Sequence, residues 1–263
     1  TLKGTKYMNI EYEGISDIGY ERTINEDFIA IEKIDENILF AIVLDGSGSK
    51  NSGLQPGSLI ATEMINSLNN YHKANKTILL NYSEVILKEC MNNAGKVLGA
   101  FKMGNDELYA GLGASATAIL ICNNKLSCCH CGNTRLYLIR SIKDNVKMLQ
   151  LTKDQTVANK LLEDKKISEE DYYYHSDRFK IIGGLGIVAE PKLQHFTIPL
   201  KLNDVLALTT DGIHYAIRGK FIKEIILQSS NCLDAVNSLK KAVELQEYSD
   251  NLATIIMQMK EDK

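Results

Sequence analysis

The sequence predicts an α+β protein built on antiparallel sheets. Apolar residues recur with a period near two in groups of neighbouring segments, as in strands joined by hairpin-length turns. Two long segments between these groups carry apolar residues three and four apart instead, which is typical of amphipathic helices. Strands and helices are therefore segregated and do not alternate as in a parallel βαβ fold. Two such sheets packed together each need helices on the outer face.

The first part of the chain contains three expected strands and then two expected helices. Glycines and the acidic turn at 35–37 separate the strands, and the helices follow the apolar spacing just described. A loose leader precedes them. The leader covers residues 1–8, the strands 9–19, 27–34 and 38–44, and the helices 59–71 and 83–101.

Strands return in the second part, interrupted by a segment rich in charge and tyrosine. We expect strands at 114–122, 125–131, 135–140, 181–186, 196–198, 205–209 and 253–259. We expect helices at 156–162, from Ser168 onward and at 233–245. An irregular region is expected to begin at 213–215. No Pro/Ser-rich linker or internal repeat divides the chain, so residues 1–263 are expected to form a single domain.

Composition describes an ordinary globular protein. Of the 263 residues, 44% are apolar and 24% are charged. The net charge is −3, with 30 basic and 33 acidic residues spread along the chain, which argues against nucleic acid or anionic lipid as a partner. No apolar run reaches the roughly 18 residues needed to span a bilayer, and the N-terminus lacks the order of a signal peptide. We expect a cytoplasmic protein with no membrane partner.

The six cysteines are expected to be reduced thiols. The cluster at 128–131 (Cys-Cys-His-Cys) invites a zinc hypothesis. However, it lies in an expected strand, where neighbouring side chains point to opposite faces. Four ligands cannot then converge on one tetrahedral ion, so small buried side chains are the better interpretation.

Asp45 follows an apolar run at 41–44. After it, glycines and serines alternate as Gly46, Ser47, Gly48 and Ser49. A carboxylate at the rigid end of a core strand, beside glycines that let backbone carbonyls approach, suits a hard cation. An Asp-Gly turn is the ordinary alternative, and from this stretch alone it is the better one.

Four other places repeat this pattern of a polar or acidic residue beside a strand end or turn. Each alone has an ordinary interpretation as a turn, a connector or a surface ion pair. The first is the segment 22–27, where the Arg22 guanidinium precedes Glu26. The others are the hairpin at 132–135 that contains Asn133, the strand end at Asp211 and the connector that contains Asp250.

Taken together and in order, these blocks resemble the metal-dependent protein phosphatases, the protein phosphatase 2C family, and specifically its compact bacterial members. The resemblance covers about residues 9–260. The matching blocks are R-x-x-N-E-D at 22–27, V-x-D-G-x-G at 43–48, G-A-S-A-T-A at 113–118, C-G-N-T-R at 131–135, L-T-K-D at 151–154, L-T-T-D-G at 208–212 and S-D-N-L-A-T at 249–254.

The resemblance implies a four-layer α-β-β-α sandwich with two Mg²⁺ or Mn²⁺ ions in a cleft at one end. Asp45 would bridge the two metals, and Asp211 and Asp250 would complete one metal site. The Gly46 carbonyl and Glu26 would serve the other metal. Arg22 would hold the substrate phosphate, in keeping with the bidentate geometry of a guanidinium. Oxygen ligands suit both metals, and paired ions can ionise a water for in-line attack on phosphorus.

Two positions depart from the family pattern. Ser47 stands where many eukaryotic members have a histidine proposed to protonate the leaving alcohol, and a serine hydroxyl is too weak an acid for this role. Asn133 replaces an aspartate that resembles the ligand of a third, weaker metal. Because a neutral amide offers only a carbonyl oxygen, we expect that third site to be weak or absent and turnover to be slower.

Residues 154–190 correspond to the variable flap beside the family's cleft. Five of its side chains could contact a phosphoprotein: Tyr172, Tyr173, Tyr174, His175 and Arg178. The alternative is that they pack within a solvated helix, and this is the better interpretation for any one of them. We expect a monomer that acts in signalling on phosphoproteins, such as a Ser/Thr kinase or its targets. The alternative is a pseudophosphatase that serves as a regulated binding module, which the altered blocks at 113–118 and 131–135 suggest.

Overall fold

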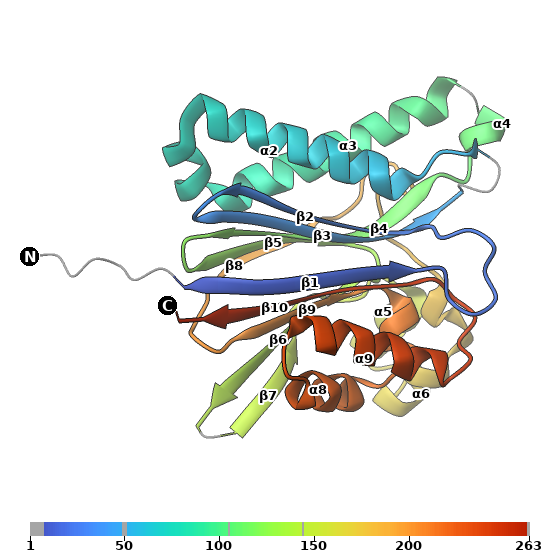
Figure 1. Ribbon diagram of the computed structural model, residues 1–263. Coiled ribbons are helices and arrows are strands. Elements are labelled where there is room, and N and C mark those ends of the chain that lie inside the picture. The colour runs from blue at the N-terminus through green and yellow to red at the C-terminus, as the bar shows by residue number, and fades with distance from the viewer. Residues whose placement is uncertain (1–7, 49–51, 105, 144, 262–263) are drawn as a thin grey trace, which may run out of the picture.

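Two five-stranded antiparallel sheets lie face to face at the centre of the protein (Figure 1). The structure is a computed structural model, and it describes residues 8–48, 52–104, 106–143 and 145–261. The upper sheet has the order β2 (Asp27–Asp35), β3 (Ile38–Ser47), β4 (Gly113–Cys122), β5 (Lys125–Cys131), β8 (Gln194–Pro199). The lower sheet has the order β1 (Asn9–Asp17), β10 (Leu252–Lys260), β9 (Val205–Thr209), β6 (Arg135–Ile142), β7 (Asn145–Gln150).

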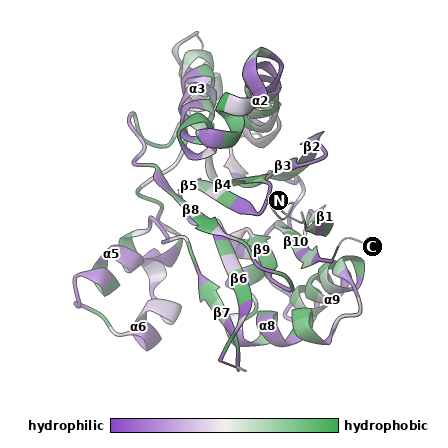
Figure 2. Ribbon diagram, turned by 90° about the vertical axis from the view of Figure 1, so that its left-hand side faces the viewer, coloured by the Kyte–Doolittle hydropathy of each residue, from purple (hydrophilic) through white to green (hydrophobic). Residues whose placement is uncertain are grey.

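Helices cover the outer face of each sheet, which completes the four-layer α-β-β-α sandwich (Figure 2). Side chains of α2 (Pro56–Asn81) and α3 (Ser83–Gly104) pack on the upper sheet. Those of α8 (Gly219–Gln228) and α9 (Cys232–Glu244) pack on the lower sheet. Side chains alternate in direction along the fully apolar run of β3, so Leu39, Ala41 and Val43 enter a core between the sheets. The predicted fold class is therefore confirmed.

Short helices lie beside the lower sheet and along its end. They are α5 (Val157–Glu163), α6 (Glu169–Tyr174), a 3₁₀ turn at Ser176–Phe179, and α7 (Asp211–His214); α4 (Asp106–Tyr109) follows α3. Thr156 and Ser168 cap α5 and α6 with their side chains, as the predicted helix starts require. Figure 2 shows α5 and α6 set apart from the sandwich on the side of β6 and β7.

Four sequence predictions of secondary structure were wrong. The segment 181–186 is not a strand, because it forms only single bridges at Ile181 and Leu185, and Gly186 (φ +71°) turns the backbone away. Residues 145–150 form the unpredicted edge strand β7, which gives little apolar signal because nearly all of its residues are exposed, on both faces. The region from 213 onward is helical in α7 and α8 rather than irregular. Helix α2 continues ten residues beyond the predicted end at 71, through a kink at Asn75.

The cysteine prediction is confirmed. All six cysteines are free and buried. Cys129 and Cys131 face the core under α2 and α3, whereas Cys128 faces the core between the sheets. His130 instead contacts the Thr117 hydroxyl and the Lys153 carbonyl oxygen. No four of these side chains can therefore converge on one metal ion.

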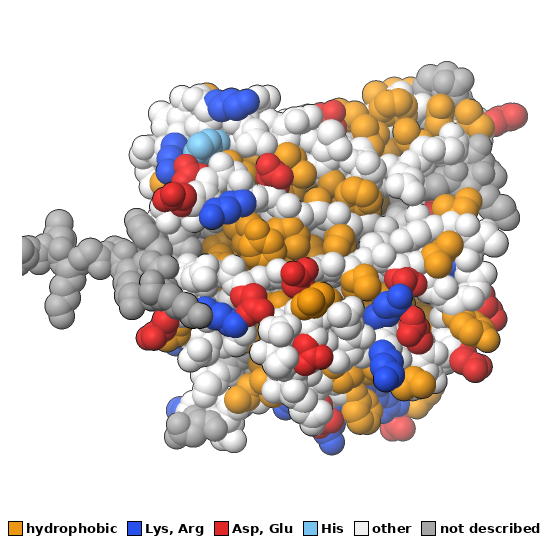
Figure 3. Space-filling model, in the orientation of Figure 1, with side chains coloured by type: hydrophobic (Ala, Val, Ile, Leu, Met, Phe, Trp, Pro, Cys, Tyr) orange, Lys and Arg blue, Asp and Glu red, His pale blue; other side chains and the backbone are white. Residues whose placement is uncertain are grey.

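The surface view in Figure 3 shows apolar side chains between the α2 layer and the lower sheet, where the edge strands β2 and β1 meet. Ile29, Ile31 and Tyr12 are only partly buried there. No helix in the described segments is long and apolar enough to cross a membrane. Of the predicted leader, residues 1–7 lie outside the described residues, as does Ser49 of the glycine-rich stretch.

Candidate metal centre

The carboxylates predicted from the sequence meet at one end of the sandwich. Asp45 pairs in register with Asp27 on β2 and with Ser115 on β4. It lies two residues after Val43, so its side chain points toward the lower sheet. There, Asp211 follows the end of β9 and Asp250 precedes β10, and these two strands are antiparallel neighbours. The antiparallel pairing places the end of β9 beside the start of β10, so Asp211 and Asp250 lie near each other, opposite Asp45.

The pKa directions show that these carboxylates interact. Burial raises the pKa of Asp45 well above its usual range, and the charges of Asp211, Asp27, Asp250 and Glu26 raise it further. Burial and the charge of Asp250 raise the pKa of Asp211 to about 7. The pKa of Asp27 is also raised, first by burial, although a hydrogen bond from Thr210 opposes the shift. The cluster is therefore a set of mutually repelling acids.

Gly46 follows Asp45 on β3, and Glu26 directly precedes the neighbouring strand β2. The Gly46 N–H donates to the Glu26 carbonyl oxygen over 3.2 Å. A Cβ at position 46 would approach that oxygen to 2.6 Å, so only glycine permits this close approach. The structure thus brings both predicted residues of the second metal site to the rim of the cluster.

Arg22 lies at the solvent edge of the site. Its Nη2 contacts Asp250 Oδ1 at 2.7 Å, and about half of its side chain (51%) is exposed. A guanidinium has five N–H donors in a planar fork, so this one contact leaves donors for a phosphate group. The predicted phosphate ligand and a predicted metal ligand are therefore direct neighbours.

Asn133 also reaches the cluster, in a different way from the one predicted. Its Nδ2 donates to Asp211 Oδ2 over 2.9 Å, and its Oδ1 accepts the Ser115 hydroxyl over 2.8 Å. The carbonyl oxygen that was expected to offer weak metal ligation is thus already hydrogen-bonded. The weak or absent third metal site stays a prediction.

The donor set fits hard divalent cations. Carboxylate and carbonyl oxygens are the ligands that Mg²⁺ and Mn²⁺ prefer, and the cluster has more negative than positive charge. Across the described residues, no three His, Cys, Asp or Glu side chains are already close enough together to bind one ion.

Three residues that stabilise the site were not predicted individually. Asp27 is buried and accepts a hydrogen bond from the Thr210 hydroxyl over 2.6 Å. Asn251 accepts from the Glu26 N–H and donates to the carbonyl oxygens of Ile18 and Ile24. It therefore fixes the loop that carries Arg22. These residues lie inside the motif blocks described above. The sequence alone does not distinguish a motif residue that binds an ion from one that positions its neighbours.

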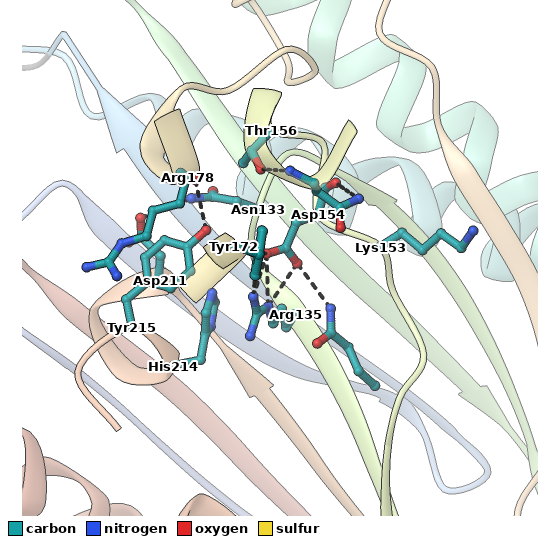
Figure 4. Close-up of polar contacts among 12 residues, drawn as sticks. Asn133, Arg135, Lys153, Asp154, Thr156, Tyr172, Arg178, Asp211, His214 and Tyr215 are labelled. Carbon is teal, nitrogen blue, oxygen red and sulfur yellow. Dashed lines mark hydrogen bonds and ion pairs between the residues drawn. The ribbon is translucent and has the colours of Figure 1, made fainter. Parts of the chain in front are cut away.

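A buried ion pair connects this region to the flap (Figure 4). Arg135 donates from Nε and Nη2 to the Asp154 carboxylate, at 2.8 and 2.6 Å. Tyr172 of α6 donates its hydroxyl to Asp154 over 2.7 Å and accepts from Arg135. Tyr172 is thus packed inside the protein, as the preferred interpretation stated, and α6 is fastened to β6.

The other aromatic and basic flap residues also make internal contacts. The Tyr173 hydroxyl donates to the His214 carbonyl oxygen, and His175 accepts from the Asp177 N–H. Arg178 stacks on Tyr215 and donates to the Tyr173 carbonyl oxygen. Tyr174 remains 70% exposed, although its hydroxyl accepts from Arg218. Of the five predicted flap residues, Tyr174 presents most of its surface to solvent.

Removal of divalent ions should make stability depend on pH through the acidic cluster. The folded-state pKa values of Asp45 and Asp211 are raised, so folding takes up protons and stability falls as pH rises from about 4 to about 7. In EDTA, Asp45→Asn should therefore match the wild type near pH 4.5 and melt at a higher temperature at pH 8. Mn²⁺ at a hundred times its Kd should raise the free energy of unfolding of the wild type by about 2.7 kcal/mol.

Differential scanning fluorimetry across pH, with EDTA or Mn²⁺, makes this measurement. An Asp45→Asn variant that is less stable than the wild type at pH 8 in EDTA would contradict the repulsion described above.

The sequence and the fold resemble those of known proteins. The protein phosphatase 2C family matches residues 20–253. Protein phosphatase PhpP of Streptococcus pneumoniae is 23% identical over 261 residues, covering 96% of this chain and 99% of its own. The Mycobacterium tuberculosis serine/threonine phosphatase PstP has a TM-score of 0.77 at 24% identity, covering 95% of this chain and 99% of its own. A PstP catalytic domain solved with two manganese ions has a TM-score of 0.76 at 23% identity, covering 97% and 100%.

Proposed function

Because the chain belongs to the protein phosphatase 2C family, we propose that it hydrolyses phosphoserine and phosphothreonine in proteins, using two bound Mn²⁺ or Mg²⁺ ions. The observation that carries this proposal is the convergence of Asp45 with Asp211 and Asp250 from opposite sheets, with Arg22 at the rim. A related PstP domain was solved with two manganese ions, which supports a centre of the same kind.

The roles proposed for the residues are those that the family resemblance implies, and the positions of the residues support them. Asp45 would bridge the two ions because it lies between the two halves of the cluster. Asp211 and Asp250 would bind one ion, and Glu26 with the Gly46 carbonyl would bind the other. Two such ions, when bound, lower the pKa of water and stabilise negative charge at phosphorus.

Arg22 would bind the phosphoryl oxygens and hold the phosphorus in line for attack. Because its side chain is half exposed, it can exchange its contact with Asp250 for one with substrate without leaving a buried charge unpaired. A serine hydroxyl is too weak an acid to protonate the leaving alcohol at neutral pH, so we assign Ser47 no such role. Its hydroxyl donates to the Gly111 carbonyl oxygen.

The proposed setting is the cytoplasm, since six free buried thiols suit a reducing compartment. We propose a monomer of one continuous domain, in which residues 154–190 form the flap beside the cleft. Its substrates would be phosphoproteins of a signalling system, such as a Ser/Thr kinase or the targets of that kinase. Similarity to PhpP supports this class of substrate.

A phosphothreonine peptide and p-nitrophenyl phosphate test the proposal directly. The purified protein should release phosphate from both in Mn²⁺ and from neither in EDTA. Absence of metal-stimulated turnover would favour the alternative, a pseudophosphatase that binds phosphoproteins without hydrolysing them. Retention of the acidic cluster together with Arg22 argues against that alternative, because a binding surface does not need this combination.

Asn133→Asp should change how turnover depends on Mn²⁺. A carboxylate at this position cannot donate to Asp211, and loss of this orienting hydrogen bond should raise by about tenfold the Mn²⁺ concentration needed for half-maximal turnover. The maximal rate should rise, because the new carboxylate provides a ligand for a third ion. Titrations of p-nitrophenyl phosphate hydrolysis with Mn²⁺ measure both effects, and identical curves for the two proteins would refute this prediction.

A further inference from the structure

We propose that Ser115 and Asn133 form a positioning pair that fixes the Asp211 carboxylate in the orientation needed to bind a divalent cation. This inference rests on the proposed function, since it assigns Asp211 to a metal site. All three side chains are buried: Ser115 is 0% exposed, Asn133 1% and Asp211 8%. They form one chain of hydrogen bonds that starts on β4 and ends at the carboxylate.

The hydrogen bonds determine which way the Asn133 amide faces. Its Nδ2 must point toward Asp211, because the reversed amide would place a carbonyl oxygen against a carboxylate oxygen at 2.9 Å. Its Oδ1 then faces Ser115, whose hydroxyl donates to it over 2.8 Å. The Ser115 oxygen in turn accepts the Asn133 backbone N–H over 3.3 Å, which directs the hydroxyl hydrogen to Oδ1.

The backbone places Ser115 against this turn. Gly132 has a φ of +95°, and a Cβ there would come within 2.2 Å of Ser115 Oγ. Glycine is therefore required at 132 for both its backbone angle and the close approach of the serine. Ser115 is also the register partner of Asp45 across β3 and β4. The pair thus links the strand position of Asp45 to Asp211 of the other sheet.

A fixed donor at Asp211 Oδ2 has a consequence for ion binding. The Asn133 Nδ2–H donor holds the plane of the carboxylate and occupies Oδ2, which leaves Oδ1 without a contact to Asn133. Removing a group that orients a metal ligand typically weakens metal affinity by about 10- to 100-fold. Because Ser115 acts only through Asn133, its removal should cost less than removal of Asn133.

The test is Mn²⁺ binding measured by isothermal titration calorimetry on the full chain, with no substrate present. Asn133→Ala should weaken binding by about 10- to 100-fold. Ser115→Ala, which keeps the Cβ and removes only the hydroxyl, should weaken it by about fivefold, the size of one net hydrogen bond. The double variant should bind like Asn133→Ala alone. At saturating Mn²⁺, the KM for p-nitrophenyl phosphate should be unchanged in Ser115→Ala.

Ser127→Ala is the matched control. Ser127 is equally buried, and its hydroxyl bonds to Ser83 and Thr197 on the α3 side of the upper sheet. This variant should lose some thermal stability and keep wild-type Mn²⁺ affinity. The proposal is overturned if Ser115→Ala binds Mn²⁺ like the wild type, or if the wild type binds no Mn²⁺. It is also overturned if Ser115→Ala weakens Mn²⁺ binding by the same factor in the Asn133→Ala variant as in the wild type. A wild type that binds Mn²⁺ without hydrolysing phosphate esters defeats the proposed function alone.

Discussion

Replacement of Asp45 by asparagine should abolish Mn²⁺-stimulated hydrolysis of p-nitrophenyl phosphate, with a loss of at least about a thousandfold in rate. Asp45 interacts with four other carboxylates and is the proposed bridge between two ions, so its charge contributes to both sites. Loss of about 4 kcal/mol of stabilisation of the transition state corresponds to this factor. Asparagine keeps the size of the side chain, and the fold should be retained.

Asp35→Asn is the matched control for this experiment. Asp35 lies at the opposite end of the β2–β3 hairpin, paired with Lys76 and His72. Its replacement should leave turnover within about twofold of the wild type, since surface ion pairs contribute little. Turnover in Asp45→Asn that equals the wild type, under the same Mn²⁺ titration, would remove Asp45 from the proposed mechanism.

Replacement of Arg135 by methionine should destabilise the protein by about 3–5 kcal/mol, because it leaves a charged partner buried and unpaired. Asp154 is 3% exposed and accepts from Arg135, Tyr172 and Gln150. For a chain of this size, the melting temperature should fall by roughly 10 °C. The flap should also loosen, since Tyr172 loses one of its two partners in this network.

Thermal unfolding measurements on two further variants test the cause. Lys160→Met removes an exposed ion pair with Asp164 on α5 and should change stability by less than about 0.5 kcal/mol. Arg135→Met combined with Asp154→Leu should recover much of the loss, because no unpaired charge then remains. If the double variant is as unstable as Arg135→Met alone or less stable, buried charge is not the reason for the loss.

Most of the fold was predictable because its signals are local. The continuous apolar run of β3 reflects a strand that is buried on both faces, and the spacing of apolar residues in α2 and α3 reflects helices that bury one face. Strand β7 and helix α8 were missed for physical reasons. Strand β7 is a solvated edge strand, and α8 has no side-chain hydrogen bond at its N-terminus to mark its start.

The residues of the candidate site could be named from the sequence, but the hydrogen bonds among them could not. Asp45, Asp211 and Asp250 each lie at a strand end, so the sequence indicates them once the strands are known. The orientation of Asn133 depends on Ser115, which is 18 positions away in the chain. The partner of Arg135 depends on how a loop folds back over β6. Such contacts arise from tertiary packing, which leaves no periodic signal in the sequence.

The order of strands in the lower sheet has a consequence for synthesis on the ribosome. Strand β10 lies between β1 and β9, so β1 has no sheet neighbour until residues 252–260 have been made. A nascent chain that already contains Asp45 and Asp211 still lacks Asp250 and the strand that joins the two halves of its sheet. Catalytic competence therefore cannot precede the emergence of β10, and a nascent chain halted before that strand is complete should remain a substrate for chaperones.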